Sequence, residues 1–161
     1  MSVYKITLAY DGTKYSGWQR QKNTDLTIQQ ILEESLTIIN KSYVLAISAG
    51  RTDAGVHAKE QIVHFELDVD IPEQRMPFAL NSILPKDIIC KDAEIVDSEF
   101  HSRYDAQGKF YRYRLSNNKF PSVFTRNYVY NIRSKLDFKK IKKAAPLLVG
   151  RHDFASFQNS G

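Results

Sequence analysis

The 161-residue chain has little of several residue types, and each shortage excludes a class of protein. Its single cysteine, Cys90, cannot form an internal disulfide, and no second cysteine stands near it to complete a CxxC zinc site. No run of about 18 apolar residues is present, and the amino terminus lacks the basic flank and apolar core of a signal peptide. We therefore expect a cytoplasmic protein that has no membrane partner and no structural disulfide or zinc site.

What the chain does contain is typical of a folded domain with an affinity for polyanions. Hydrophobic residues make up 42% and charged residues 25%, so a disordered or fibrous chain is excluded. There are 23 Lys and Arg against 18 Asp and Glu, and the net charge of +5 favours nucleic acid without requiring it. Aromatic residues alternate with cations in Lys109–Arg114, a pattern suited to stacking on unpaired bases.

Hydrophobic periodicity predicts the first elements of the fold. Alternation over residues 3–10 predicts a half-buried strand that stops at Asp11-Gly12. Thr27 is a predicted N-cap for a helix over about 27–40. Residues 43–49 and 60–67 are predicted to be strands.

The second part of the chain completes the pattern. A second helix is predicted between Pro72 and Pro85, followed by a strand over 87–96. This order, β-α-β-β-α-β, predicts an α+β fold of the ferredoxin-like kind: an antiparallel sheet with helices on one face and the opposite face free for a ligand. A further strand at 108–116 and a helix at 137–148, capped by Asp137, are expected to follow.

The loop Gly50–Ala58 is the most unusual stretch, since it holds two glycines, an arginine, a threonine, an aspartate and a histidine. Turn chemistry alone explains it as a tight turn in which Asp53 or Thr52 bonds its own backbone. Alternatively, Asp53 is a nucleophile or general base. Arg51, two residues earlier, would then keep it ionised by pairing and could also contact phosphate.

Other side chains admit two interpretations each. Gln19 and Arg20 are candidates to line an RNA path beside Trp18, whose indole is equally suited to core packing. His57 is a candidate RNA contact, although local hydrogen bonding is the more common role of a loop histidine. Arg103 is a candidate phosphate contact or a solvated surface charge.

The residues of the Gly50–Ala58 loop, Gly-Arg-Thr-Asp-Ala-Gly-Val-His-Ala, resemble the signature of the TruA family of tRNA pseudouridine synthases. Further segments agree in the same order along the chain. These segments are Ala9–Thr13, Tyr15–Gln21, Thr27–Gln29, Phe100–Ala106, Lys109–Tyr113 and His152–Phe157. The resemblance therefore extends over essentially the whole chain.

This resemblance implies an isomerase without cofactor or metal, acting on uridines at positions 38–40 of the tRNA anticodon stem-loop, and a homodimer. Asp53 matches the family's catalytic aspartate, which attacks the sugar C1′ or promotes glycosidic cleavage so that uracil rejoins through C5. Arg51 matches the arginine that interacts with this aspartate and helps hold the RNA open. Tyr111 matches the tyrosine that stacks on the flipped base, whereas the pattern alone favours an inward-facing strand residue.

Family members continue beyond the point where this sequence stops, into a second half that carries a further basic residue. The resemblance thus implies a catalytic half over 1–107 and the truncated start of a second half over 108–161. A truncated, catalytically silent RNA-binding module of the same family is the alternative. The lysine run 139–143 is interpreted as the solvated side of an amphipathic helix rather than a specific RNA site.

Overall fold

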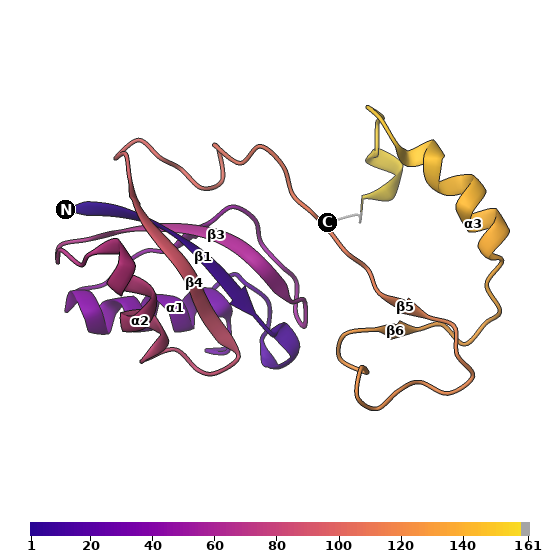
Figure 1. Ribbon diagram of the computed structural model, residues 1–161, viewed down its shortest axis with the longest axis horizontal. Helices are drawn as coiled ribbons and strands as arrows, with labels where there is room; N and C mark the ends of the chain where they lie inside the picture. The colour runs from indigo at the N-terminus through magenta and orange to yellow at the C-terminus, as the bar shows by residue number, and fades with distance from the viewer. Residues whose placement is uncertain (159–161) are drawn as a thin grey trace. The chain divides into compact units, whose positions relative to one another are not determined.

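The computed structural model describes residues 1–158 and divides the chain into two compact units, Met1–Phe110 and Tyr111–Gly161. Figure 1 shows the sheet and the helices α1 (Ile28–Asn40) and α2 (Met76–Asn81) of the first unit, and the short strands and the helix α3 (Phe138–Ala144) of the second. No helix within residues 1–158 has the length and apolar character needed to cross a membrane.

The first unit is built on an antiparallel four-stranded sheet. Its strands are β1 (Ser2–Tyr10), β2 (Ile47–Ser48), β3 (Ala58–Leu67) and β4 (Ile88–Val96), in the order β2-β3-β1-β4. β1 pairs with β3 on one side and β4 on the other, and β2 pairs with β3. The first strand in sequence is therefore central, while β2 and β4 form the edges.

One face of the sheet carries the hydrophobic core. Alternate β1 side chains, Tyr4, Ile6 and Leu8, are fully buried, as period-2 packing on one face requires. They form one cluster with buried residues of α1 (Ile28–Asn40) and α2 (Met76–Asn81). Both helices lie on the same side of the sheet (Figure 1).

Local capping chemistry sets the ends of α1. The Thr27 side chain accepts a hydrogen bond from the Gln30 backbone N at 3.3 Å, which confirms the predicted N-cap. The helix ends at Lys41, whose left-handed backbone (φ 60°) lets its N–H bond the Thr37 carbonyl. Two 3-10 turns complete the unit, η1 (Gly12–Lys14) and η2 (Glu73–Arg75).

The opposite sheet face is covered in part, contrary to the expectation that it is free. Ser102 donates its backbone N–H to His64 Nδ1 at 3.1 Å, and its hydroxyl lies 2.8 Å from the Ile47 carbonyl. The Phe100 ring meets His64 edge-on. Burial, together with the nearby His101, lowers the pKa of His64, which keeps the imidazole neutral and able to accept this bond.

The second unit has little regular structure. It contains a parallel pair of short strands, β5 (Leu115–Ser116) and β6 (Tyr130–Asn131), the helix α3 (Phe138–Ala144), and 3-10 turns η3 (Ala145–Leu148) and η4 (Ala155–Phe157). The Asp137 carboxylate accepts from the Lys140 N–H at 3.1 Å, so the predicted cap of α3 is confirmed. None of residues 111–158 is buried, and this unit therefore has no core of its own within the described chain.

Three predicted elements are shorter than expected. The strand predicted over 43–49 is reduced to β2 because Ala46 donates its N–H to the Glu33 carboxylate of α1 instead of to a strand. The strand predicted over 108–116 is reduced to β5, since no strand pairs with 108–114 among the described residues. The helix predicted over 137–148 changes to a 3-10 turn where Pro146 lacks the required N–H.

We predict that Leu36→Ala lowers the free energy of unfolding of the first unit by about 2–5 kcal/mol, because Leu36 is fully buried. Urea unfolding followed by the fluorescence of Trp18, the only tryptophan and a core residue, measures this. Ile38→Ala on the same helix is the control: Ile38 is 63% exposed, and a change within about 0.5 kcal/mol is expected. Equal losses in the two variants would contradict the packing described.

Candidate active site

The loop between β2 and β3 is fixed by backbone hydrogen bonds to the segment that follows β1. The Trp18 N–H donates to the Thr52 carbonyl at 2.9 Å, and the Gly55 N–H donates to the Tyr15 carbonyl at 3.1 Å. Within the loop, the Val56 N–H donates to the Asp53 carbonyl at 3.1 Å. The main chain on both sides of Asp53 is therefore held in place.

A side-chain contact adds to this support. The hydroxyls of Tyr10 and Thr52 lie 2.9 Å apart. Burial raises the pKa of Tyr10, an effect that the hydrogen bond to Thr52 opposes. Thr52 is thus bonded through its carbonyl and its hydroxyl to two different residues, and the backbone immediately before Asp53 has little freedom.

Two glycines allow the segments to come this close. A Cβ placed on Gly12 would lie 1.9 Å from the Val56 carbonyl oxygen, a distance that no side chain tolerates. Gly17 has a φ of +91°, and a Cβ there would lie 2.6 Å from the Thr52 carbonyl oxygen. The glycines of the 12–17 segment are therefore part of the architecture of the Asp53 loop.

His57 connects the end of the loop to the turn after β1. Its Nδ1 lies 3.1 Å from the Gly12 backbone N and 3.0 Å from Asp11 Oδ1. A neutral imidazole accepts from the Gly12 N–H, whereas a protonated one donates to the Asp11 carboxylate. His57 thus makes the local contacts typical of a loop histidine, and its side chain is only partly exposed.

The side chains of Asp53 and Arg51 both point into solvent. No ion pair joins them anywhere in the described chain, so the pairing expected from their spacing is not formed in this structure. The physical reason is that an ion pair between two hydrated side chains contributes only about 0–1 kcal/mol, too little to hold both in one geometry. The Asp53 carboxylate is consequently open to a molecule arriving from solvent.

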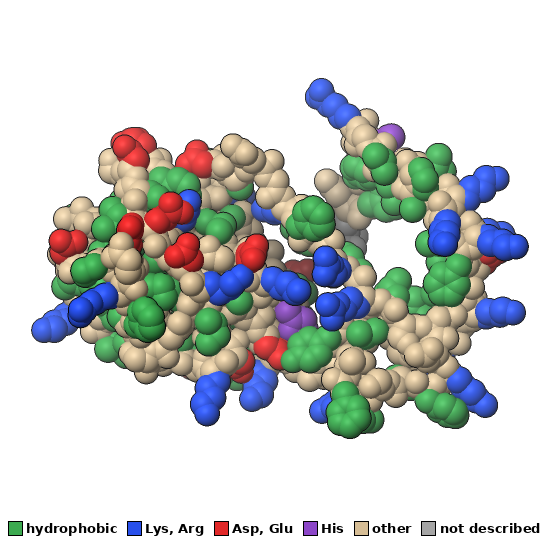
Figure 2. Space-filling view, in the orientation of Figure 1, with side chains coloured by type: hydrophobic (Ala, Val, Ile, Leu, Met, Phe, Trp, Pro, Cys, Tyr) green, Lys and Arg blue, Asp and Glu red, His purple; other side chains and the backbone are tan. Residues whose placement is uncertain are grey.

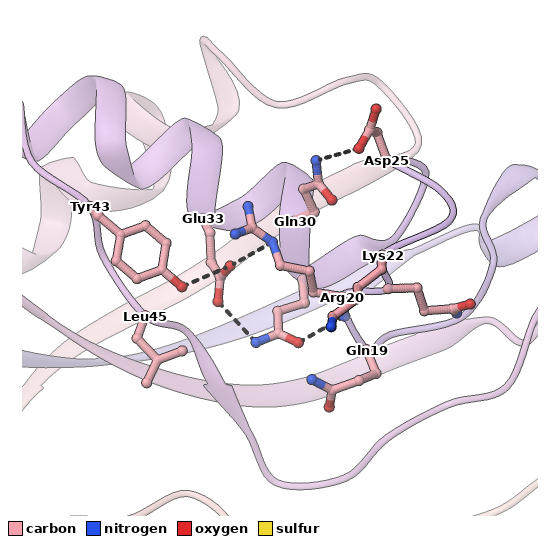
Figure 3. Close-up of a pocket in the computed structure, with 10 residues that line it drawn as sticks. Gln19, Arg20, Lys22, Asp25, Gln30, Glu33, Tyr43 and Leu45 are labelled. Carbon is pink, nitrogen blue, oxygen red and sulfur yellow. Dashed lines mark hydrogen bonds and ion pairs between the residues drawn. The ribbon is translucent and has the colours of Figure 1, made fainter.

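A polar groove of about 620 Å³ follows the same segment beyond Trp18 (Figure 3). Gln19 and Arg20, both predicted site residues, line it. The Arg20 Nε lies 3.4 Å from a Glu33 carboxylate oxygen, and its guanidinium lies 5.9 Å from the Tyr43 ring centre. In Figure 3 these three side chains point toward one another. Arg20 is therefore held by the protein, with its outer part still exposed.

Sequence reasoning missed Glu33, whose side chain is only 1% exposed. Its carboxylate accepts hydrogen bonds from Gln29 Nε2 at 2.9 Å and from the Ala46 backbone N at 3.2 Å. A buried carboxylate needs such partners to offset its lost hydration. The available signal was the spacing of Gln29 and Glu33, four residues apart on the helix and therefore neighbours on its surface.

The remaining predicted residues are not all in this site. Trp18 is 1% exposed and packs with Tyr10 in the core, which corrects its assignment as an RNA-facing side chain. The reason is that burying the large apolar indole in the core stabilises the fold, while the Trp18 backbone N–H bonds the loop. Arg103 is exposed in the segment that covers the second sheet face. Tyr111 is the first residue of the second unit and is 68% exposed.

The arrangement supplies one reactive group of a defined kind. Asp53 presents an accessible carboxylate on a fixed loop, a group that can act as a nucleophile or a general base, and the Arg51 cation lies two residues away in the sequence. Residues 1–158 contain no group of three His, Cys, Asp or Glu side chains placed to hold a metal ion. The chemistry available here is that of an exposed carboxylate on a fixed loop.

Comparison with known proteins adds independent information. A family described as tRNA pseudouridine synthase matches residues 6–105. The tRNA pseudouridine synthase A of Acetivibrio thermocellus is 44% identical over 161 residues, which is 100% of this chain and 66% of the relative. That of Limosilactobacillus reuteri is 48% identical over 164 residues, covering 100% of this chain and 64% of the relative. The chain thus spans about two thirds of the length of these relatives.

We predict that Gly12→Ala lowers the free energy of unfolding by about 1–3 kcal/mol, because the Val56 carbonyl must move to admit the new Cβ. Urea unfolding monitored by Trp18 fluorescence tests it. Gly108→Ala is the matched control, since nothing lies within 4 Å of a Cβ at that position, and we expect a change within about 0.5 kcal/mol. A Gly12→Ala variant as stable as the control would disprove the close contact between the two segments.

Proposed function

Because the chain belongs to the tRNA pseudouridine synthase family, we propose that it isomerises uridine to pseudouridine in tRNA with Asp53 as its catalytic residue. The observation that carries the proposal is the accessible Asp53 carboxylate on a loop whose backbone is fixed at Thr52, Gly55 and Val56. Such a loop positions a reactive group before the substrate arrives, which lowers the entropic cost of the reaction.

In the proposed reaction the Asp53 carboxylate attacks the ribose C1′ or promotes cleavage of the bond between C1′ and uracil N1. The freed uracil then rotates and its C5 bonds to C1′, and on the first route this attack displaces the Asp53 carboxylate from C1′. The hydrogen on C5 is then lost as a proton and N1 gains a proton. Atoms are conserved between uridine and pseudouridine, so the step needs no oxidant, reductant or cofactor. The target base must leave the helical stack to reach an exposed carboxylate, as base-modifying enzymes generally require.

We propose that the side chains around the loop bind the RNA. Arg51 faces solvent, where its guanidinium can contact a phosphate and hold the RNA open. The Arg20 guanidinium and the Gln19 amide line the groove that continues from the loop segment. Arg103 is exposed and can contact the RNA backbone, while His57 contributes through its partly exposed ring.

The proposal extends to Tyr111 as the residue that stacks on the flipped base. Its exposed ring offers a face for uracil, as aromatic residues do in RNA-binding proteins. The uridines acted on are proposed to be those at positions 38–40 of the anticodon arm, and the enzyme to be a cytoplasmic homodimer without metal or cofactor. The positions 38–40, the homodimer and the absence of a metal or cofactor rest on the family resemblance.

The proposal also includes the topology of the fold and the division of the chain into two halves. The antiparallel order β2-β3-β1-β4, with α1 between β1 and β2 and α2 between β3 and β4, supports the ferredoxin-like arrangement. We propose that residues 1–107 form the catalytic half and that 108–161 begin a second half. A catalytically silent RNA-binding module of the same family is the alternative.

The test is release of tritium from tRNA labelled at C5 of uridine, because only breaking of the C5–H bond liberates the label. We expect the 161-residue chain to release tritium and Asp53→Asn to be slower by at least about 10³-fold, as when a nucleophile is removed. Asp70→Asn is the matched control, since Asp70 is an exposed carboxylate on the turn after β3, and it should act as the wild type does. Binding of tRNA without any release of tritium would favour the silent module instead.

A further inference from the structure

The two units differ strongly in charge. In Met1–Phe110 there are 12 Lys and Arg against 16 Asp and Glu, a formal charge of −4. From Tyr111 onward there are 11 Lys and Arg against two Asp and Glu, a formal charge of +9. In Figure 2 acidic side chains gather on the first unit, whereas basic side chains stand out along α3. The modest net charge of the whole chain therefore conceals a strongly basic unit.

The two acidic residues of the second unit do not neutralise its cations. Asp137 uses its carboxylate to cap α3, accepting from the Lys140 N–H at 3.1 Å. Asp153 accepts from the Ala155 N–H at 2.9 Å. No lysine of α3 forms an ion pair with any residue that the structure describes. The positive charge of the helix is thus available to an external partner.

Three of the four lysines of α3 lie close together around the helix. With about 3.6 residues per turn, Lys139, Lys142 and Lys143 fall within an arc of about 100°, and Ile141 lies on the opposite side. All three lysines are exposed. We refer to Lys139, Lys142 and Lys143 as the α3 lysine face.

Helix stability does not account for these positions. Like charges three and four residues apart repel each other, as Lys139 does with Lys142 and Lys143. Lys139 lies in the first turn, where the partial positive charge of the helix end disfavours a cation, although Lys142 and Lys143 near the other end are favoured. A bound polyanion would remove both the repulsion and the unfavourable end effect.

We propose that the α3 lysine face is a docking surface for the phosphodiester backbone of the tRNA substrate. The proposal rests on the proposed function, which supplies the polyanion, and on the charge complementarity of the second unit. Ammonium groups on flexible side chains bind phosphates without reading sequence, so this surface contributes affinity and orientation rather than choice of uridine. Such contacts release counterions from the RNA, which makes the affinity depend on salt.

The test compares two triple variants with the same net charge. Lys139, Lys142 and Lys143 are changed to Gln in one, and Lys41, Arg75 and Lys86, three exposed cations of the first unit, are changed to Gln in the other. Binding of an unmodified tRNA transcript to the 161-residue chain is measured at several salt concentrations. Far-ultraviolet circular dichroism checks that each variant keeps its helices, and a variant with Arg at the three α3 positions keeps the charge.

We expect the α3 variant to bind tRNA at least about tenfold more weakly at 0.1 M salt. The slope of log affinity against log salt should decrease in magnitude by about two to three, since three phosphate contacts are lost. The first-unit variant and the Arg variant should retain the wild-type affinity and slope. An unchanged affinity of the α3 variant, or an equal loss in the first-unit variant, would overturn the proposal.

A basic amphipathic helix can also bind an acidic membrane surface, and vesicles of phosphatidylcholine with phosphatidylserine test this. Lysine-dependent binding to these vesicles that is tighter than binding to tRNA would overturn the RNA assignment.

Tritium release by the wild-type chain, compared with the lysine dependence of its tRNA binding, separates this inference from the proposed function. Lysine-dependent binding without tritium release from the wild type would contradict only the proposed function, whereas release by a wild type whose tRNA binding ignores the lysines would contradict only this inference.

Discussion

The contact between the Asp53 loop and the segment after β1 is the constraint on which the rest of the site depends. Thr52 is bonded through its carbonyl to the Trp18 N–H and through its hydroxyl to Tyr10. Because Trp18 and Tyr10 belong to the core, the loop is anchored to the most stable part of the first unit. The approach is so close that Gly12 and Gly17 cannot carry a side chain, and the Asp53 carboxylate is exposed on a loop whose backbone is hydrogen-bonded to its neighbours.

A second polar anchor shapes the molecule beside this loop. Burying the Glu33 carboxylate has a large cost in hydration, which its bonds to Gln29, Arg20 and the Ala46 N–H offset. One of these bonds takes Ala46 out of the sheet, and this explains why β2 has only two residues. The same carboxylate also fixes Arg20 at the edge of the groove. One buried charge thus determines both an edge of the sheet and the position of a candidate RNA contact.

Local signals were enough to predict the central elements. Alternation in β1, the Thr27 cap of α1 and the Asp137 cap of α3 depend on neighbours in sequence, and each was found. Residues 43–46 could not be predicted, because their partner is a carboxylate on α1 rather than a strand. The prominence of the Gly50–Ala58 loop was also visible in the sequence. Its support by Tyr10 and Thr52 was not, since that contact spans 42 residues of chain.

The two units differ in how they attract or repel the proposed RNA substrate, and neither the overall composition nor the motifs show this difference. The unit that holds Asp53 is net negative, so its average field opposes the approach of a polyanion such as RNA, and the Asp53 carboxylate adds to that field. Attraction must then come from local cations such as Arg51 and Arg20, or from the second unit with its formal charge of +9. Under the proposed function, a division of this kind lets the Asp53 carboxylate remain accessible in solvent, while side chains that take no part in the chemistry supply the affinity for a polyanion.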